Sequence, residues 1–306
     1  MSKIQPIKYY NRISSVYEIE KVYGDAAVKW LYQSFLGKTL AWVLTRKWLS
    51  FLYGLYQSTS FSAKKVPVFI NEFQINMNEY KAGSLKQHNK NNSYATFNEF
   101  FIREFEDGKR SFTQDHNLMP AFAEARYVGF ESINDEFVFP VKGKFLRAAQ
   151  LLGGNFTDES FSGGPLMIAR LCPVDYHRYH YPDNGRVLKS FDVHGDYHSV
   201  NPIALKAKPD IFLKNERRVS ILETENFGKL AFIEVGAICV GKIVQTHNES
   251  HPFYRGQEKG YFLFGGSTVI VIGEKGKWKP STDILANTQT GIETYTHLGS
   301  TIAALV

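Results

Sequence analysis

The chain has 306 residues, of which 43% are hydrophobic and 15% aromatic, so it is long enough to bury a sizeable core. Its formal charge of +6 suits an anionic membrane surface but is too small to identify a partner by itself, and we expect no nucleic-acid partner. The two cysteines, Cys172 and Cys239, provide neither a disulfide framework nor the spacing of metal ligands, which favours a reducing compartment.

The first 60 residues suggest helices near a membrane. Residues 1–15 lack the apolar run and small-residue cleavage site of a secretory signal. Residues 19–57 carry apolar side chains at three- and four-residue intervals, which predicts helix. Their aromatic residues lie among basic ones, which suits the headgroup layer of a bilayer, but a helical hairpin packed on the core explains the pattern equally well. No apolar run reaches about 18 residues, so we expect no membrane-spanning helix.

The remaining chain changes character at about residue 110. Residues 66–80 and 94–105 are predicted to be helical, with a polar loop at 81–93. Short apolar strands separated by Gly, Pro and Asn follow. The predicted strands are Phe137–Val141, Leu166–Leu171, Leu230–Val235, Ile238–Val244 and Tyr261–Ile272. We therefore predict an α+β fold in which a helical, membrane-associating region, residues 1–110, precedes a β-rich catalytic core, residues 111–306.

The segment Val174–Gly185, VDYHRYHYPDNG, holds the densest group of reactive side chains. Asp175, His177 and His180 lie close together in it. Imidazole titrates near neutrality and a carboxylate can orient it, so general acid–base chemistry fits this group. No third ligand is spaced for a metal, and a merely polar surface turn is the alternative. Glu124, taken alone, is expected to be solvated or paired with an arginine.

The stretch Phe264–Ile272, FGGSTVIVI, places two glycines directly before Ser267 and a β-branched run that predicts a strand. Taken alone, it is a glycine bulge or tight turn that leads into a core strand. The chain contains no phosphate-loop, dinucleotide-binding or hydrolase-elbow motif, so those functions lose their usual support.

Six segments, in chain order, are similar to the successive motifs of the pyruvoyl-dependent phosphatidylserine decarboxylases. They are FNEFFIRE (97–104), VDYHRYHYPDNG (174–185), GDYHSVN (195–201), LKNER (213–217), VGAICVGKI (235–243) and KGYFLFGGSTVIVI (259–272). The YHRxH and GST elements are highly specific when they occur together. The N-terminal third resembles the family only in being helical and aromatic. GGST replaces the commoner LGST, which indicates a subgroup.

The resemblance implies a proenzyme that cuts itself between Gly266 and Ser267. A β chain, 1–266, and an α chain, 267–306, would remain associated. Ser267 would become a pyruvoyl group, a covalent cofactor that forms a Schiff base with phosphatidylserine and accepts electrons as CO2 leaves, so that phosphatidylethanolamine is released. The glycines suit this chemistry because they have no Cβ and permit a strained backbone.

The resemblance also implies a peripheral enzyme on the cytoplasmic face of a cell membrane, where the substrate stays in an anionic bilayer. No metal is expected. The sequence leaves open whether the protein is a monomer or a homodimer, and which acyl chains it prefers.

Residue roles follow from the same resemblance, which implies a self-cleavage triad of an acid, a histidine of the YHRxH element and the serine. His180 is the first choice for the cleavage base and His177 for the decarboxylation step, although the two could exchange roles. Glu124 stands where the family commonly has aspartate, and Asp175 is the fallback. Two alternatives remain: an unprocessed homologue that only binds anionic membrane or a partner, and a Ser-His-acid hydrolase that uses intact Ser267.

Overall fold

The computed structural model describes most of the chain. The described residues are 6–21, 47–85, 89–133, 148–153, 159–196, 198–200, 210–237, 242–265 and 267–306. Among them, nine strands form one large sheet. These strands are β1 (Lys8–Asn11), β2 (Val16–Ile19), β4 (Ala125–Phe130), β5 (Leu166–Leu171), β7 (Gly185–Val193), β8 (Arg217–Thr224), β9 (Lys229–Gly236), β12 (Ser267–Gly273) and β14 (Glu293–Thr296).

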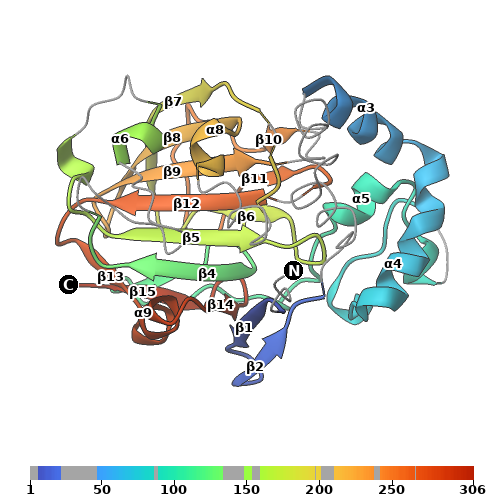
Figure 1. Cartoon of the computed structure of the whole chain (residues 1–306), viewed down its shortest axis with the longest axis horizontal. Helices are drawn as coiled ribbons and strands as arrows, with labels where there is room; N and C mark the ends of the chain where they lie inside the picture. The colour runs from blue at the N-terminus through green and yellow to red at the C-terminus, as the bar shows by residue number, and fades with distance from the viewer. Residues whose placement is uncertain are drawn as a thin grey trace, which may run out of the picture.

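The large sheet has the order β2-β1-β14-β4-β5-β12-β9-β8-β7, so β12 lies between β5 and β9 near its middle (Figure 1). Neighbouring strands run antiparallel, except that β1 is parallel to β14. Every residue of β12 is buried, as expected for a β-branched run in a sheet that is covered on both faces. Because β12 is hydrogen-bonded on both sides, the residue at its start has a fixed position.

Two smaller sheets and one helix pack against the large sheet. One sheet consists of β6 (Arg178–His180), β10 (Ile243–Gln245) and β11 (Glu258–Phe262). The other consists of β3 (Leu118–Pro120), β13 (Trp278–Pro280) and β15 (Thr301–Leu305). The helix is α9 (Thr282–Gln289). Tyr179 of β6 contacts Phe232 of β9, with ring centroids 6.1 Å apart. Lys259 of β11 forms a fully buried ion pair with Glu234 of β9 at 2.7 Å. These contacts fix β6, which directly follows His177, over the centre of the large sheet.

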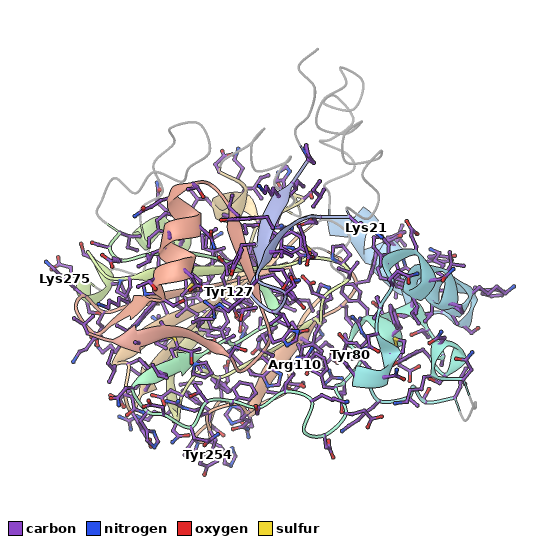
Figure 2. The ribbon with its side chains drawn as sticks, turned by 90° about the horizontal axis from the view of Figure 1, so that it is seen from below. Lys21, Tyr80, Arg110, Tyr127, Tyr254 and Lys275 are labelled. Carbon is purple, nitrogen blue, oxygen red and sulfur yellow. The ribbon has the colours of Figure 1, made fainter. Side chains whose placement is uncertain are left out.

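A group of helices at one end of the sheet forms what we call the helical module (Figure 1). It consists of α3 (Lys47–Gln57), the 3-10 helix η1 (Ser60–Lys64), α4 (Lys65–Phe73) and α5 (Phe97–Phe101). Its buried side is strongly aromatic, and Phe97 and Phe101 on it pack against Phe264, which lies between β11 and β12. Figure 2 shows Arg110 where the module meets the sheet, and its guanidinium forms ion pairs with Glu79 and Glu124. Shorter helices are η2 (Met77–Glu79), η3 (Lys90–Asn92), α6 (Ala148–Leu151), η4 (Glu159–Phe161) and α8 (Ile211–Lys214).

The β-rich, α+β character predicted from the sequence is confirmed. The predicted strands at 166–171 and 230–235 are β5 and part of β9. Residues 22–46, most of the predicted N-terminal helix, and the predicted strand 137–141 lie outside the described residues. In the described ranges, no helix combines the length and the apolar character needed to cross a bilayer. The division of the chain at about residue 110 stays a prediction, and the first two strands of the chain belong to the large sheet.

Several predicted boundaries are wrong for local reasons. Residues 261–272 are not one strand. Gly265 has φ +146°, and the extended structure is interrupted between the end of β11 and the start of β12. The helix predicted for 66–80 ends at Phe73, where Gln74 takes a left-handed conformation. The helix predicted for 94–105 is shorter, because Thr96 caps it and it ends at Phe101. Residue 19, the predicted start of the N-terminal helix, is instead the last residue of β2, Val16–Ile19.

Candidate active site

Ser267 is the first residue of β12, and it pairs with Leu171 of β5 and Gly236 of β9. Its side chain is fully buried. Gly265, two residues earlier, has a φ of +146° that side chains with a Cβ rarely adopt, while Gly266 lies outside the described residues. The β-branched run thus anchors a hydroxyl in the core directly after a glycine-dependent turn.

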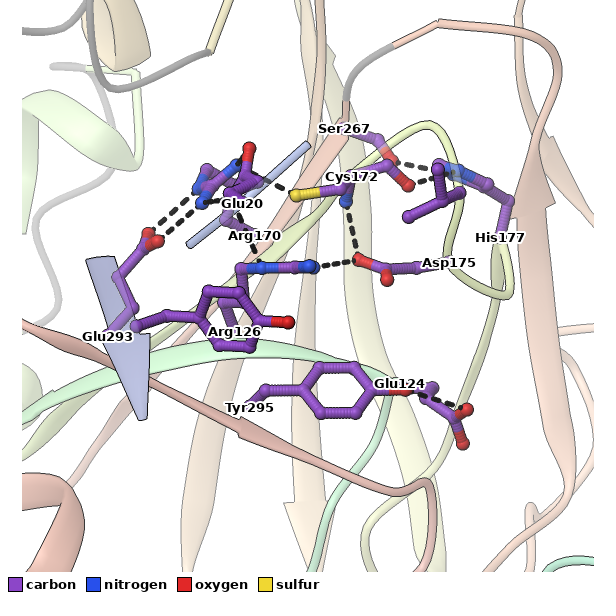
Figure 3. Close-up of polar contacts among 12 residues, drawn as sticks. Glu20, Glu124, Arg126, Arg170, Cys172, Asp175, His177, Ser267, Glu293 and Tyr295 are labelled. Carbon is purple, nitrogen blue, oxygen red and sulfur yellow. Dashed lines mark hydrogen bonds and ion pairs between the residues drawn. The ribbon is translucent and has the colours of Figure 1, made fainter. Parts of the chain in front are cut away.

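His177 lies against this hydroxyl. Its Nδ1 is 3.2 Å from Ser267 Oγ, and its Nε2 is 2.9 Å from the carbonyl oxygen of Cys172 (Figure 3). A carbonyl can only accept a hydrogen bond, so Nε2 carries the proton and Nδ1 presents a lone pair to the hydroxyl. Burial, reinforced by the positive charge of Arg103, holds the pKa of His177 well below its usual value. The imidazole is therefore neutral near pH 7 and oriented as a base.

His180 has a different set of neighbours. Its Nδ1 bonds to the carbonyl oxygen of Gly256 at 2.9 Å, and its Nε2 lies 3.3 Å from the hydroxyl of Tyr176. The two histidines are separated by the start of β6, since His177 belongs to the turn after β5 and His180 to the strand. The structure therefore brings His177, and not the first-choice His180, to Ser267.

Neither predicted acid contacts either histidine in the described part of the chain. Glu124 accepts hydrogen bonds from Arg110 (2.5 and 2.8 Å), the hydroxyl of Tyr295 (3.1 Å) and the backbone N–H of Leu298 (3.2 Å). Both of its oxygens are thus occupied by donors other than imidazole, as the arginine-paired reading of Glu124 expected. In the structure, the group that orients the base is a backbone carbonyl rather than a carboxylate.

Asp175 stabilises the turn that carries the base. Its Oδ2 accepts bonds from Arg126 Nη1 and from the backbone N–H of Cys172, both at 2.7 Å (Figure 3). Burial raises the pKa of Asp175, although Arg126 opposes this effect. The carboxylate therefore acts on the backbone of residues 172–175, one step away from the imidazole.

A buried ionic network that the sequence analysis missed lies behind this turn. Arg126 and Arg170 are cross-strand neighbours in β4 and β5. Glu20 bonds to both of them, and Glu293 pairs with Arg170. Although burial opposes it, the two arginines lower the pKa of Glu20 to about 2. The network joins the N-terminal segment, the centre of the sheet and the segment after residue 267.

Aromatic side chains of the helical module close the other side of the site. The ring of Phe101 stacks on His177 with centroids 3.7 Å apart. Phe264, three residues before Ser267, packs edge-on against Phe97 and Phe101 at 5.0 and 4.9 Å. The backbone N–H of Phe264 also donates to Asn98 Oδ1 at 2.9 Å. The module thus positions both the base and the segment that precedes the serine.

The arrangement provides a buried nucleophile, a neutral base in contact with it and a glycine-dependent turn on its N-terminal side. In the described residues, no group of three or more His, Cys, Asp or Glu side chains is placed to bind a metal ion. Such a site can move a proton from a serine hydroxyl and let the oxygen attack a neighbouring carbonyl carbon.

Comparison with known proteins agrees with this chemistry. Residues 97–304 match the model of the family described as phosphatidylserine decarboxylase. The chain is 42% identical over 296 residues to the phosphatidylserine decarboxylase proenzyme of Clostridium tetani, which covers 97% of both chains. Proenzymes of the same name from Clostridium botulinum and Clostridium perfringens are 40% and 39% identical, with 97% of this chain covered and 98% and 99% of theirs.

Proposed function

Since the chain belongs to the phosphatidylserine decarboxylase family, we propose that it cuts itself between Gly266 and Ser267 and then converts phosphatidylserine to phosphatidylethanolamine. It is a carboxy-lyase made as a proenzyme. The observation that supports the self-cleavage most directly is the 3.2 Å contact between Ser267 Oγ and the unprotonated Nδ1 of His177. We also propose that the GGST form of the cleavage motif marks a subgroup of the family.

In the first step, His177 Nδ1 takes the proton of Ser267 as Oγ attacks the carbonyl carbon of Gly266. The C–N bond breaks, the amine of residue 267 gains a proton and an ester joins the two residues. Removal of the α proton of residue 267 then expels the carboxylate of Gly266 and leaves a dehydroalanine, whose hydrolysis releases ammonia. The new N-terminus of the α chain is a pyruvoyl group.

The residues around Ser267 fit such a group. Position 267 is buried, paired with Leu171 and Gly236, and beside His177, and we infer that this strand pairing holds it there after the bond before it is cut. The pyruvoyl ketone supplies an electron sink for the loss of CO2. We assign the proton transfers at this position to His177, because it is the histidine that contacts Ser267. The rings of Phe101 and Phe264 would limit the access of water to the site.

The α chain would remain bound to the β chain after the cut. It contributes β12, which lies between two strands of the β chain, and β14, whose Glu293 pairs with Arg170. Separating the chains would open the middle of the large sheet. A homodimer remains a further proposal.

Intact mass spectrometry of the purified full-length protein tests this function. We expect a 40-residue fragment that spans residues 267–306 and carries a pyruvoyl N-terminus, together with CO2 release from phosphatidylserine. A single intact chain of 34.9 kDa would contradict the proposal and favour an unprocessed homologue. A hydrolase that uses intact Ser267 would also leave one chain, but the full burial of that hydroxyl argues against it.

We further propose that the helical module docks the enzyme on an anionic bilayer, on the cytoplasmic face of a cell membrane. Its outer side exposes apolar side chains beside Lys64 and Lys65. They are Leu52 (52% exposed), Leu55 (50%), Tyr56 (42%), Phe61 (73%) and Val68 (65%). Apolar and basic groups on one surface suit partial insertion next to anionic headgroups. The opposite side of the module packs on the active site. The described part of these helices therefore supports both the membrane-surface interpretation and the interpretation as helices packed on the core.

The double variant Phe61→Asp and Val68→Asp should lose flotation with phosphatidylserine-containing liposomes, because two new carboxylates would face the anionic surface. Self-cleavage should be unchanged, since both side chains point away from the core. Tyr254→Asp, at a side chain that is 65% exposed and far from the module in Figure 2, is the matched control. Equal flotation of the double variant and the control would refute this docking surface.

A further inference from the structure

The turn between β5 and β6 carries the base, and two arginines from different elements hold its backbone. Arg103, two residues after α5, donates from Nη2 to the carbonyl oxygens of Val174 (2.8 Å) and Asp175 (3.2 Å). Arg126 of β4 holds the Asp175 carboxylate, which in turn accepts from the N–H of Cys172. The carbonyl of Cys172 then faces Nε2 of His177. The orientation of the base therefore depends on how this turn is fixed.

The two arginines differ in whether a carboxylate balances their charge. Arg126 has Asp175 and Glu20 as partners. Arg103 is only 2% exposed, yet it forms no ion pair with a carboxylate in the described part of the chain. Aromatic rings of Tyr80 and Phe100 flank its guanidinium at 4.4 and 4.8 Å. Within the same part, its Nε is buried without a hydrogen-bond partner. A buried charge of this kind is costly for stability, which favours a role beyond packing.

We propose that Arg103 is a positioning residue for self-cleavage, which fixes the 172–177 turn through two carbonyls and places a permanent positive charge next to His177. This inference rests on the proposed function and adds a residue to it. Two effects follow from the geometry. The turn keeps the Cys172 carbonyl against Nε2, which leaves Nδ1 free for Ser267. The nearby charge disfavours protonation of the imidazole, so the base stays neutral.

The groups around His177 show why the charge of Arg103 affects the pKa of this histidine. Phe101 stacks on the ring from α5, Ser267 faces it from β12, and the Cys172 carbonyl belongs to its own turn. Asp175 and Arg126 face the turn as a mutually bonded pair. The low pKa of His177 arises from burial and then from Arg103, and the carbonyl contacts oppose both. Removing the charge of Arg103 should therefore raise the pKa of His177.

The test compares Arg103→Met with Arg103→Lys and a matched control, Arg217→Met. Arg217 is another buried arginine, which bonds to backbone carbonyls such as those of Leu151 and Gln150, and in the described part of the chain it has no hydrogen bond to the 172–177 turn. Full-length precursors are made in a short pulse of cell-free translation and transferred to buffers between about pH 5 and 8. The appearance of the fragment 267–306 is then followed by intact mass.

Arg103→Met should cleave between about tenfold and a hundredfold more slowly, with its pH profile moved to higher pH. Arg103→Lys keeps the positive charge but loses the planar guanidinium that bonds to both carbonyls, so it should cleave slowly with the wild-type pH profile. Arg217→Met should keep the wild-type profile, whatever its thermal stability. Identical rates and profiles for Arg103→Met and Arg217→Met would overturn the proposal. If Arg103→Met does not fold, wild-type behaviour of Arg103→Lys overturns it instead. Failure of the wild-type chain to cleave would refute the proposed function itself.

Discussion

Replacing Ser267 with alanine should leave a single uncleaved chain of 34.9 kDa with no decarboxylase activity. The reason is chemical, since alanine has no oxygen to attack Gly266 and no precursor of the pyruvoyl group remains. The fold should survive, because position 267 is a buried strand residue whose hydroxyl makes one side-chain hydrogen bond among the described residues, with His177. Intact mass spectrometry measures whether the chain is cleaved, and a thermal melt of the same preparation measures whether the fold survives.

Two further variants separate nucleophilic attack from a structural role of the hydroxyl. Ser267→Cys keeps a nucleophile, and its thioester should let hydroxylamine split the chain at this position. Thr268→Val is the matched control, because the hydroxyl of Thr268 is buried with no hydrogen-bond partner in the described part of the chain. Thr268 pairs with Arg170 across the sheet, and its side chain points to the face opposite that of Ser267. This control should cleave normally. Cleavage in Ser267→Ala would refute the mechanism.

The family resemblance, and not local sequence alone, pointed to Ser267 as the nucleophile and to two candidate histidines for the base. The β-branched run Val269–Ile272 predicted the core of β12 but not its start at Ser267, and two histidines three residues apart favoured acid–base chemistry. Spacing could not choose between them. The choice depends on where β6 begins, because the chain changes from turn to strand between His177 and His180. Element boundaries of this kind are set by tertiary hydrogen bonds, such as that from the N–H of His180 to the carbonyl of Phe122.

The ionic network could not be predicted for a different reason. Arg126 and Arg170 become neighbours only through the register of β4 and β5, and two like charges side by side in a sheet repel each other. Their neutralisation requires Glu20 and Glu293, which come from opposite ends of the chain. No local pattern links these four residues. The same long-range packing explains why Glu124 is occupied by Arg110 instead of serving an imidazole.

His177→Gln should slow self-cleavage by between about a hundredfold and ten-thousandfold, while His180→Gln should cleave at close to the wild-type rate. Glutamine at 177 can still donate to the Cys172 carbonyl, but it has no basic nitrogen to take the proton of Ser267. Glutamine at 180 can keep a donor for the Gly256 carbonyl, so the turn should hold its shape. The matched pair thus differs in the base and not in packing.

The pH dependence distinguishes the two histidines further. Because burial and Arg103 keep the pKa of His177 below its usual value, the base is already neutral at pH 7. Cleavage of the wild-type chain should therefore be insensitive to pH above neutrality and fall only as acid protonates His177. His180→Gln should retain this fall, and His177→Gln should lose it along with most of the rate. If His180→Gln blocks cleavage and His177→Gln does not, the base is His180. The turn that carries the two histidines must then rearrange before the bond is cut, because in the structure only His177 contacts the serine among the described side chains.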